Sequence, residues 1–323
     1  MAGQFLTAVA GPLFCSAVSI IANVWFGDKD RNIATALGSI GIPLGNLVSL
    51  VFTGVVFAGY VPEDDEKHGG DDLKSRIKLL LVVQNVIVSF FCISLFLLVK
   101  EKPAHPPSRS ALDKPVENKM CKELATLLKN KSYVMVLLIS AILSGNFVTV
   151  GNLLSPIYAP YGHSASFIAS FGVAFTFGGV LGSIIVGIVL DKTKAFLRAT
   201  RLVCFLSCGM TAFMMYALPT RVAWLAAMSC FVSGFVMIPI IPISFSFTVE
   251  LTHPTPPASA NGLMLIVSKL VALLLSLFGG YLADIDPVYA LLGMAIAAGV
   301  SVIFSFFIKE VLKRSNGDKA AAN

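Results

Sequence analysis

The sequence NGLMLIVSKLVALLLSLFGGYLA, residues 261–283, contains a single charged side chain, Lys269. A helix that crosses the hydrocarbon core of a bilayer needs roughly 20 mostly apolar residues. The apolar character extends over the whole chain, because 56% of its 323 residues are hydrophobic and only 13% are charged. Soluble chains average about 45–50% apolar and about 25% charged residues. We therefore predict an all-α integral membrane protein, since unpaired backbone amides are too costly in hydrocarbon.

Nine apolar runs of this kind follow one another along the chain. Core helices of a soluble protein are a poor alternative, because such a fold would leave no amphipathic helices to form its surface. The first run begins at Met1 without a basic segment and is too long for a signal peptide, so we predict a genuine span. The predicted spans are 2–25, 33–61, 77–99, 133–158, 165–190, 202–218, 222–249, 261–283 and 287–308.

Basic residues are distributed unequally between the two sides of the membrane that nine spans define. One side carries 18 of the 24 Lys and Arg residues, whereas the other carries five, together with the acidic run EDDE at 63–66. Because cytoplasmic loops are enriched in basic residues, we expect the C-terminus in the cytoplasm and the N-terminus outside. The sequon at Asn130 then lies in the cytoplasm and should carry no glycan. The host membrane is the plasma membrane or an internal membrane.

The longest polar stretch, 100–132, contains eight basic residues and four prolines. It predicts a cytoplasmic linker between a partial N-terminal bundle of three spans, 1–99, and a bundle of six spans, 133–309. Within the linker, residues 118–131 fit a short amphipathic helix at the membrane surface, and a plain solvated linker fits about as well. We expect the cytoplasmic tail, 310–323, to be disordered.

Small residues and prolines mark places where the spans pack closely or break. Gly178 and Gly182 form a small-xxx-small pair, which favours close helix packing over the alternative of a flexible, rocking helix. Pro239 and Pro242 interrupt the run 222–249, because proline bends a helix and frees a carbonyl group.

An acidic and a basic residue meet at the cytoplasmic end of the span 165–190. Asp191 and Lys192 can bridge neighbouring helices and so hold one conformation, although the same pair can also be merely solvated. Together with Gly187, and with Glu250 at the end of a later span, they are our predicted conformational latch.

Four polar side chains inside spans are the predicted substrate-cavity residues: Asn46, Asn146, Asn152 and Lys269. Lys269 lies roughly 12 Å into its span. A lysine at this depth is costly unless it faces water or a partner, and the alternative is a side chain that snorkels to the cytoplasmic surface. For the asparagines, interhelical hydrogen bonds are the commoner role. Tyr158, at the end of its span, fits an outer aromatic belt or a pore lining.

Signatures of catalysis and metal binding are missing from the sequence. It has no HExxH, GxSxG or P-loop motif, and none of the six cysteines forms a CxxC pair. We expect no enzyme activity, no catalytic residues, no metal ligands and no cofactor. Because the basic residues are scattered through short loops, we expect no nucleic-acid partner either. The expected partners are the lipid bilayer and a small-molecule solute.

Several short stretches carry a family resemblance. They are NVWFG (23–27), GIPLG (41–45), LSGNF (143–147), GIVLDK (187–192) and PISFSFTVELTHP (242–254) with ANGL (260–263). In order, they resemble the fourth and fifth helices, the seventh helix, the C-terminal acidic–basic loop motif and the junction between the tenth and eleventh helices of one family. This family is the feline leukaemia virus subgroup C receptor-related (FLVCR-like) transporters of the major facilitator superfamily. The resemblance covers nearly the whole chain.

The resemblance implies a particular division of the spans. A family member has twelve spans, six on each side of a cytoplasmic linker. The chain would then be a major facilitator-type bundle with a partial N-terminal half and a complete six-helix C-terminal half. We expect that the first three helices are missing, either because the gene model is truncated or because a shortened product exists. The family's cytoplasmic linker and C-terminus agree with the orientation deduced from charge.

The family is associated with choline, ethanolamine and haem transport, but the positions that it implies for substrate contact differ here. The family's seventh-helix tyrosine falls at Val148, its fifth-helix glutamine at Pro43, and an eleventh-helix glutamine near Lys269. An aromatic residue on the family's first helix has no counterpart. Since a choline-like cation favours aromatic faces and not a lysine, these departures point to a different solute, such as an organic anion.

We predict a secondary transporter that moves a small organic solute by alternating access, with its site near the bilayer midplane. Candidate solutes are a choline-like cation, haem and an organic anion. The alternative is a non-transporting membrane receptor or a regulatory partner derived from a transporter, because the loss of three helices removes one wall of the site. The sequence upstream of Met1 distinguishes the two, since three further spans there favour the transporter.

Overall fold

The computed structural model describes residues 31–57, 71–98, 120–193, 195–252 and 255–308, together with residues 11, 21, 25 and 26. The described chain is helical and contains no strand. Its helices are α2 (Arg31–Val56), α4 (Asp71–Leu98), α5 (Met120–Lys129), α6 (Lys131–Tyr158), η2 (Ala159–Tyr161), α7 (Ala165–Thr193), α8 (Phe196–Ala217), η3 (Leu218–Thr220), α9 (Ala223–Met237), α10 (Ile240–Thr252), α11 (Pro257–Ile285) and α12 (Pro287–Phe306).

Seven helical segments of the described chain are long and apolar enough to cross a membrane. They correspond to the last seven of the nine predicted spans and confirm the all-α membrane fold. The predicted ends differ by several residues, and α4 begins at Asp71, six residues before the predicted start at 77. The predicted span 33–61 overlaps α2, of which Leu44–Val56 is a shorter apolar helix. The predicted span 2–25 lies almost wholly outside the described residues.

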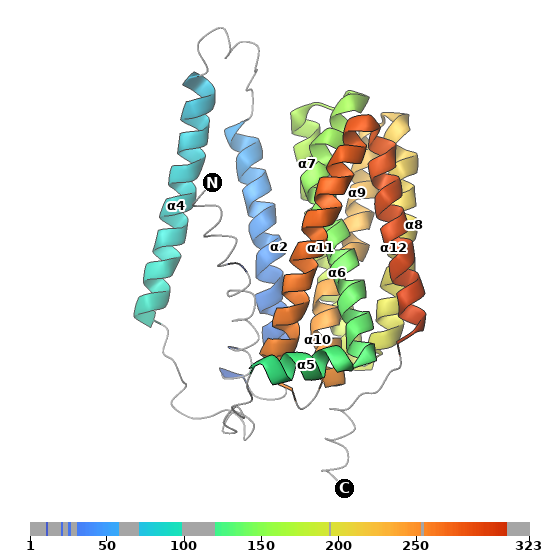
Figure 1. The fold of residues 1–323 in the computed structure, drawn as a ribbon. Coiled ribbons are helices and arrows are strands. Elements are labelled where there is room, and N and C mark those ends of the chain that lie inside the picture. Colours follow the sequence, from blue (N-terminus) through green and yellow to red (C-terminus); the bar gives the residue numbers. More distant parts are fainter. Residues whose placement is uncertain are drawn as a thin grey trace.

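Helices α6 to α12 pack side by side as one bundle, and α2 packs against α7 on its outside (Figure 1). Helix α4 stands beyond α2, where its apolar side chains are largely exposed. Helix α5 crosses one end of the bundle, which we call the α5 end. Two predicted domain limits, 99 and 309, and the predicted disordered tail lie outside the described residues, so the division into domains stays a prediction.

Glycines allow α7 and α9 to approach closely, as the small-xxx-small pair predicts. A Cβ atom built on Gly178 would lie 2.2 Å from the Phe231 carbonyl oxygen, and one on Gly182 would lie 2.1 Å from that of Phe235. The approach is reciprocal, because a Cβ on Gly234 of α9 would lie 1.8 Å from the Phe175 oxygen of α7. Only hydrogen fits between these backbones, so the packing role of the pair is confirmed.

The predicted interruption of the run 222–249 separates α9 from α10. A turn at Ile238 and Pro239 lies between the two helices. The helical pattern resumes with a bond from the Ile243 nitrogen to the Pro239 oxygen, 3.2 Å long. Both helices stay inside the bundle, where neighbouring helices enclose the freed backbone groups.

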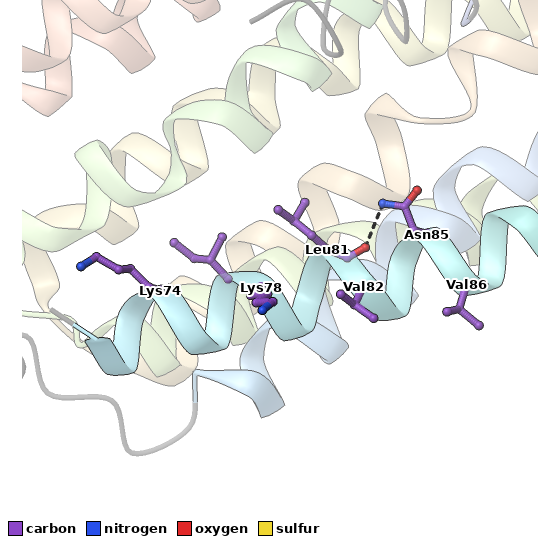
Figure 2. Close-up of a pocket in the computed structure, with 7 residues that line it drawn as sticks. Lys74, Lys78, Leu81, Val82, Asn85 and Val86 are labelled. Carbon is purple, nitrogen blue, oxygen red and sulfur yellow. Dashed lines mark hydrogen bonds between the residues drawn. The ribbon is translucent and has the colours of Figure 1, made fainter.

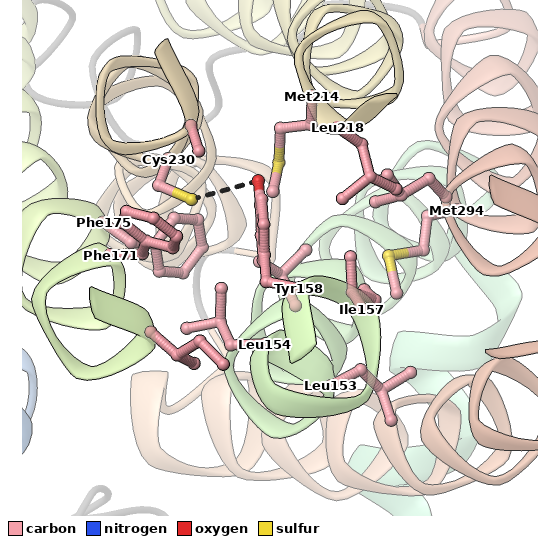
Figure 3. Close-up of a cluster of buried hydrophobic side chains, with 14 of the residues drawn as sticks. Leu153, Leu154, Ile157, Tyr158, Phe171, Phe175, Met214, Leu218, Cys230 and Met294 are labelled. Atoms are coloured by element: carbon pink, nitrogen blue, oxygen red, sulfur yellow. Dashed lines mark hydrogen bonds between the residues drawn. The ribbon is translucent and has the colours of Figure 1, made fainter. Parts of the chain in front are cut away.

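A core of apolar side chains holds α6, α7, α8, α9 and α12 together in the half of the bundle distant from α5 (Figure 3). Tyr158 is fully buried in this core, with its hydroxyl 3.5 Å from the Cys230 sulfur and its ring against Phe171. The prediction of an aromatic belt or a pore lining was therefore wrong for Tyr158. Several helices converge around the end of α6, and a hydropathy pattern does not show this enclosure.

Helix α5 is anchored to the bundle through its apolar face. Leu127 is 1% exposed and packs in a cluster with Tyr133, Leu137 and Ala260. The Ser259 hydroxyl, in the first turn of α11, donates a 2.6 Å hydrogen bond to the Glu123 carboxylate of α5. The linker segment 118–131 thus contains an amphipathic helix, and the alternative of a plain solvated linker is wrong for residues 120–129.

Candidate functional site

Polar side chains meet along the seam between α6 and α11. The seam is close because Gly145 of α6 faces α11, where a Cβ atom on Gly145 would lie 3.3 Å from the Ala272 nitrogen. One turn further along, the Thr149 hydroxyl lies 3.1 Å from the Ser276 hydroxyl, and Asn152 donates to the same Ser276 oxygen at 3.3 Å. Thr149 is buried whereas Asn152 is exposed, so the cluster extends from the core to the bundle surface.

Lys269 lies on the same side of α11 as Ser276. The two residues are seven apart, which places them almost above one another and about 10 Å apart along the axis. Lys269 is exposed and makes no hydrogen bond or ion pair with any residue that the structure describes. Asn152, Ser276, Lys269 and the exposed Ser155 of α6 form what we call the polar flank.

The depth of Lys269 is compatible with both interpretations of this lysine. It follows Val267 by two residues, and Val267 packs against the cluster that anchors α5. A long stem at this level can carry its ammonium group to the polar surface near α5. Its position on the polar flank also allows the ammonium group to meet a solute, so the predicted cavity role stays a prediction.

Asn146 lies apart from the polar flank. Its side chain is fully buried, and its amide nitrogen donates a 3.0 Å hydrogen bond to the Met294 carbonyl oxygen of α12. This is the interhelical hydrogen bond that we considered as the alternative role. The Asn146 side-chain oxygen is buried without a partner among the described residues.

Asn46 lies on α2, a different part of the molecule. It is exposed, and it precedes by one helical turn Leu50, which lies over Gly172 of α7. The structure therefore links only Asn152 directly to other polar side chains, while Asn46, Asn146 and Lys269 occupy separate positions.

The predicted latch residues gather at the α5 end. Helices α7 and α10 both end there, and Leu190 and Leu251, next to Asp191 and Glu250, belong to one buried cluster. Glu250 is 8% exposed. Lys192 is exposed, and a Cβ atom on Gly187 would meet nothing within 4 Å.

A shallow depression of about 470 Å³ lies on α4, away from the polar flank. Figure 2 shows Lys74, Lys78 and several apolar side chains along this one helix, with Asn85 donating to the Leu81 carbonyl oxygen at 3.1 Å. Lys74 also pairs with Asp71 at 3.3 Å. A depression lined by a single exposed helix has no opposing wall, so we do not place the solute site here.

Ser276 and Thr149 are the site residues that the sequence reasoning missed. A sequence signal for Ser276 existed, because it is the polar residue two turns after Lys269 on the same helix face. Thr149 carried no such signal, since its importance depends on which residue of α11 it faces. In the described ranges, no group of three or more His, Cys, Asp or Glu residues could hold a metal ion.

The bundle of long apolar helices, with polar side chains concentrated at a helix seam, defines a multi-pass helical membrane protein. Residues 1–275 match the family model described as Major Facilitator Superfamily, so the chain belongs to this superfamily. Within it, the chain is similar to FLVCR transporters.

Relatives with a known description align with most or all of this chain. The choline/ethanolamine transporter FLVCR1 of Felis catus is 29% identical over 331 residues, which include 100% of this chain and 58% of the relative. The human choline/ethanolamine transporter FLVCR2 is 26% identical over 327 residues, covering 98% of this chain and 60% of the relative. Solute carrier family 49 member A3 of Danio rerio is 24% identical over 275 residues, covering 85% and 55%. The chain thus spans roughly three fifths of the length of these relatives.

A solved structure supports the same fold. The major facilitator transporter FucP, in the outward conformation, superposes with a TM-score of 0.67 at 16% identity and covers 93% of this chain and 73% of its own. Since the relatives are named as transporters, they point to a protein other than an enzyme.

Proposed function

We propose that this chain belongs to a secondary transporter that moves a small organic solute across a membrane by alternating access. Membership of the major facilitator superfamily and the FucP-like fold support this proposal. The relatives described above are named as transporters, so the alternative of a non-transporting receptor or regulatory partner is not favoured.

The polar flank is the proposed solute-contacting surface of this chain. The single observation that carries the proposal is the hydrogen-bonded pair Asn152–Ser276, at 3.3 Å, two turns from the unpaired ammonium group of Lys269 on the described chain. Amide and hydroxyl groups can hydrogen-bond a solute at one end, and a lysine can bind an anionic group at the other. Asn46 and Asn146 stay candidates on position alone.

Among the candidate solutes, the chemistry of the flank favours an organic anion over haem or a choline-like cation. Lys269 repels a quaternary ammonium group, which prefers aromatic faces. The names of the relatives support choline or ethanolamine instead, so these solutes belong in the first test.

The α5 end would hold the conformational latch. The shared cluster of Leu190 and Leu251 supports the idea that Asp191 and Glu250 respond together when α7 and α10 move. We further propose that this end faces the cytoplasm, of either the plasma membrane or an internal membrane, because the loops at this end carry most of the Lys and Arg residues.

Uptake into proteoliposomes that contain the chain tests the proposal. The panel is radiolabelled choline, ethanolamine, haem and several mono- and dicarboxylates. We expect one anion to accumulate, Lys269→Ala to reduce its uptake by about tenfold, and Lys269→Arg to retain most of it, because one lost charge-assisted contact is worth about 1.5–3 kcal/mol. Lys129→Ala, which removes an exposed lysine of α5, is the matched control.

Three outcomes would contradict parts of the proposal. Uptake that is equal in Lys269→Ala, Lys129→Ala and the unchanged chain would exclude the cavity role of Lys269. Accumulation of choline alone would instead support a cation transporter. No uptake of any solute, by protein that retains its unfolding temperature, would favour the non-transporting alternative.

A further inference from the structure

Two arginines begin α8 at the α5 end and face away from the bundle core. Arg198 is exposed and Arg201 is half-buried, and the two lie three residues apart, so that their side chains are neighbours on one helix face. Neither forms an ion pair with a residue that the structure describes. The first turn of α8 contains no acidic residue, and the cap residue Ala195 supplies no side-chain hydrogen bond. This helix start therefore concentrates positive charge without a described counter-charge.

The Arg201 side chain is held in one orientation by α12. Its Nε donates to the Ser305 carbonyl oxygen at 3.3 Å, and its guanidinium carbon lies 5.6 Å from the centre of the Phe306 ring. These two contacts use the inner edge of the guanidinium group. The terminal nitrogens have no acceptor in the described ranges, so a planar fork of donors is left for another partner.

An apolar track continues from these arginines into the membrane. Leu202 is 59% exposed, and Phe205 and Phe306 are 53% and 59% exposed. The two aromatic rings meet edge to face, with centres 6.1 Å apart, and so join the exposed faces of α8 and α12. Arg198, Leu202 and Phe205 follow one another at the spacing of a single helix face.

The height of this surface in the membrane matches a lipid headgroup. Residues Phe196–Thr220 form one of the spanning segments, and both arginines lie in its first two turns. The first turns of a span lie at the boundary between hydrocarbon and water, where lipid phosphates are found. Fixed arginine donors at the boundary, with exposed aromatic and aliphatic side chains below them, complement a molecule with an anionic head and an acyl chain.

We propose that Arg198 and Arg201 bind the headgroup of an anionic phospholipid, whose acyl chain lies along Leu202, Phe205 and Phe306. The occupant is a lipid and not a free anion, because the exposed apolar track gives a soluble phosphate no additional contact. With the orientation proposed above, this lipid belongs to the cytoplasmic leaflet, in which anionic lipids are concentrated. The lipid contact would hold the α8 start and the α12 end together.

Native mass spectrometry of the purified chain, titrated with phosphatidylglycerol or phosphatidylcholine, tests this site. We expect the first phosphatidylglycerol to bind more tightly than phosphatidylcholine. Arg198→Gln should weaken phosphatidylglycerol binding about fivefold, and the double variant with Arg201→Gln should weaken it about 25-fold, because each basic residue contributes roughly this factor at an anionic surface. Arg221→Gln is the matched control, because Arg221 is exposed and follows η3, at the end of α8 remote from Arg198.

Three results would overturn the site. They are equal affinity of the unchanged chain for the two lipids, unchanged phosphatidylglycerol binding in Arg198→Gln, and full displacement of the lipid by inorganic phosphate, which would indicate a free-anion site. Arg198→Gln decides the question even if Arg201→Gln fails to fold, because Arg198 is exposed and contacts no described partner. None of these three results depends on whether the chain transports a solute.

Discussion

Polar residues inside apolar helices occupy three different environments in this protein. Asn146 is fully buried and joins α6 to α12, whereas Asn152 reaches the bundle surface through Ser276. Lys269 is exposed and unpaired in the described chain. The same sequence signal, a polar residue within a span, thus corresponds to a structural bond in one case and to an accessible group in the others. The difference depends on which neighbouring helix each side chain meets.

Asn130 connects α5, α6 and α10 at the residue scale. Its side-chain oxygen accepts from the Tyr133 nitrogen at 3.3 Å and caps α6, and its amide nitrogen donates to the Leu251 oxygen at 3.2 Å. We expect Asn130→Ala to destabilise the protein by about 1 kcal/mol through the lost cap. Asn130→Asp keeps the capping acceptor and should lose less.

Thermal unfolding in detergent, followed with a thiol-reactive dye, measures this difference, because the buried Cys204 and Cys230 become reactive on unfolding. Equal unfolding temperatures for both Asn130 variants and the unchanged chain would show that the cap contributes nothing.

The helices are defined by two kinds of local signal. Long apolar runs set their number and approximate position, and proline sets the break between α9 and α10 at Pro239. Their association depends on a different signal, the small residues at which backbones meet. Gly178, Gly182 and Gly234 remove the side chains that would separate α7 from α9.

At the scale of helix packing, Gly182→Ala should separate α7 from α9. Its Cβ would lie 2.1 Å from the Phe235 oxygen, so the helices must move apart at a cost of about 1–3 kcal/mol. Gly187→Ala is the matched control on the same helix, because a Cβ there meets nothing within 4 Å. In the thermal unfolding assay we expect a lower unfolding temperature only for Gly182→Ala. A similar decrease for both variants would mean that helix propensity, and not close packing, determines the effect.

The whole molecule combines a bundle of spanning helices with two further helices, α2 and α4, beside it (Figure 1). Its family relatives are longer, since the chain covers 58% of FLVCR1 and 60% of human FLVCR2. The longer relatives possess additional segments. The apolar surface of α4 is exposed in a structure that does not include such segments.

The proposed orientation makes a prediction for the whole molecule. The acidic run at 63–66 should face the outside, and the linker that contains Cys121 should face the cytoplasm. We expect a membrane-impermeant maleimide to label Glu66→Cys in intact cells. Cys121 should react only after the membrane is permeabilised, and Asn130 should carry no glycan. Labelling of Cys121 in intact cells, or a glycan on Asn130, would indicate the opposite orientation.

The sequence predicted the membrane fold, the seven described spans, the break at Pro239 and the tight packing of Gly178 and Gly182, because each of these depends on residues near one another in the chain. It was less successful with side chains whose role depends on remote neighbours. Tyr158 was placed in a belt or pore, although it lies in a core built from several helices. Thr149 was missed because it is not unusual until α6 and α11 are brought together, whereas Ser276 carried a signal in its spacing from Lys269 that was overlooked.

The sequence by itself determined that this protein is a helical membrane protein and which segments cross the bilayer, because hydrophobic length and charge act locally and need no partner. The resemblance in short motifs also indicated the superfamily that the family match confirmed. Only the tertiary structure decided which polar groups face each other and which arginines have no acidic partner among the described residues. Those properties depend on distances between helices far apart in sequence, as at the Asn152–Ser276 pair and at the contact of Arg201 with α12.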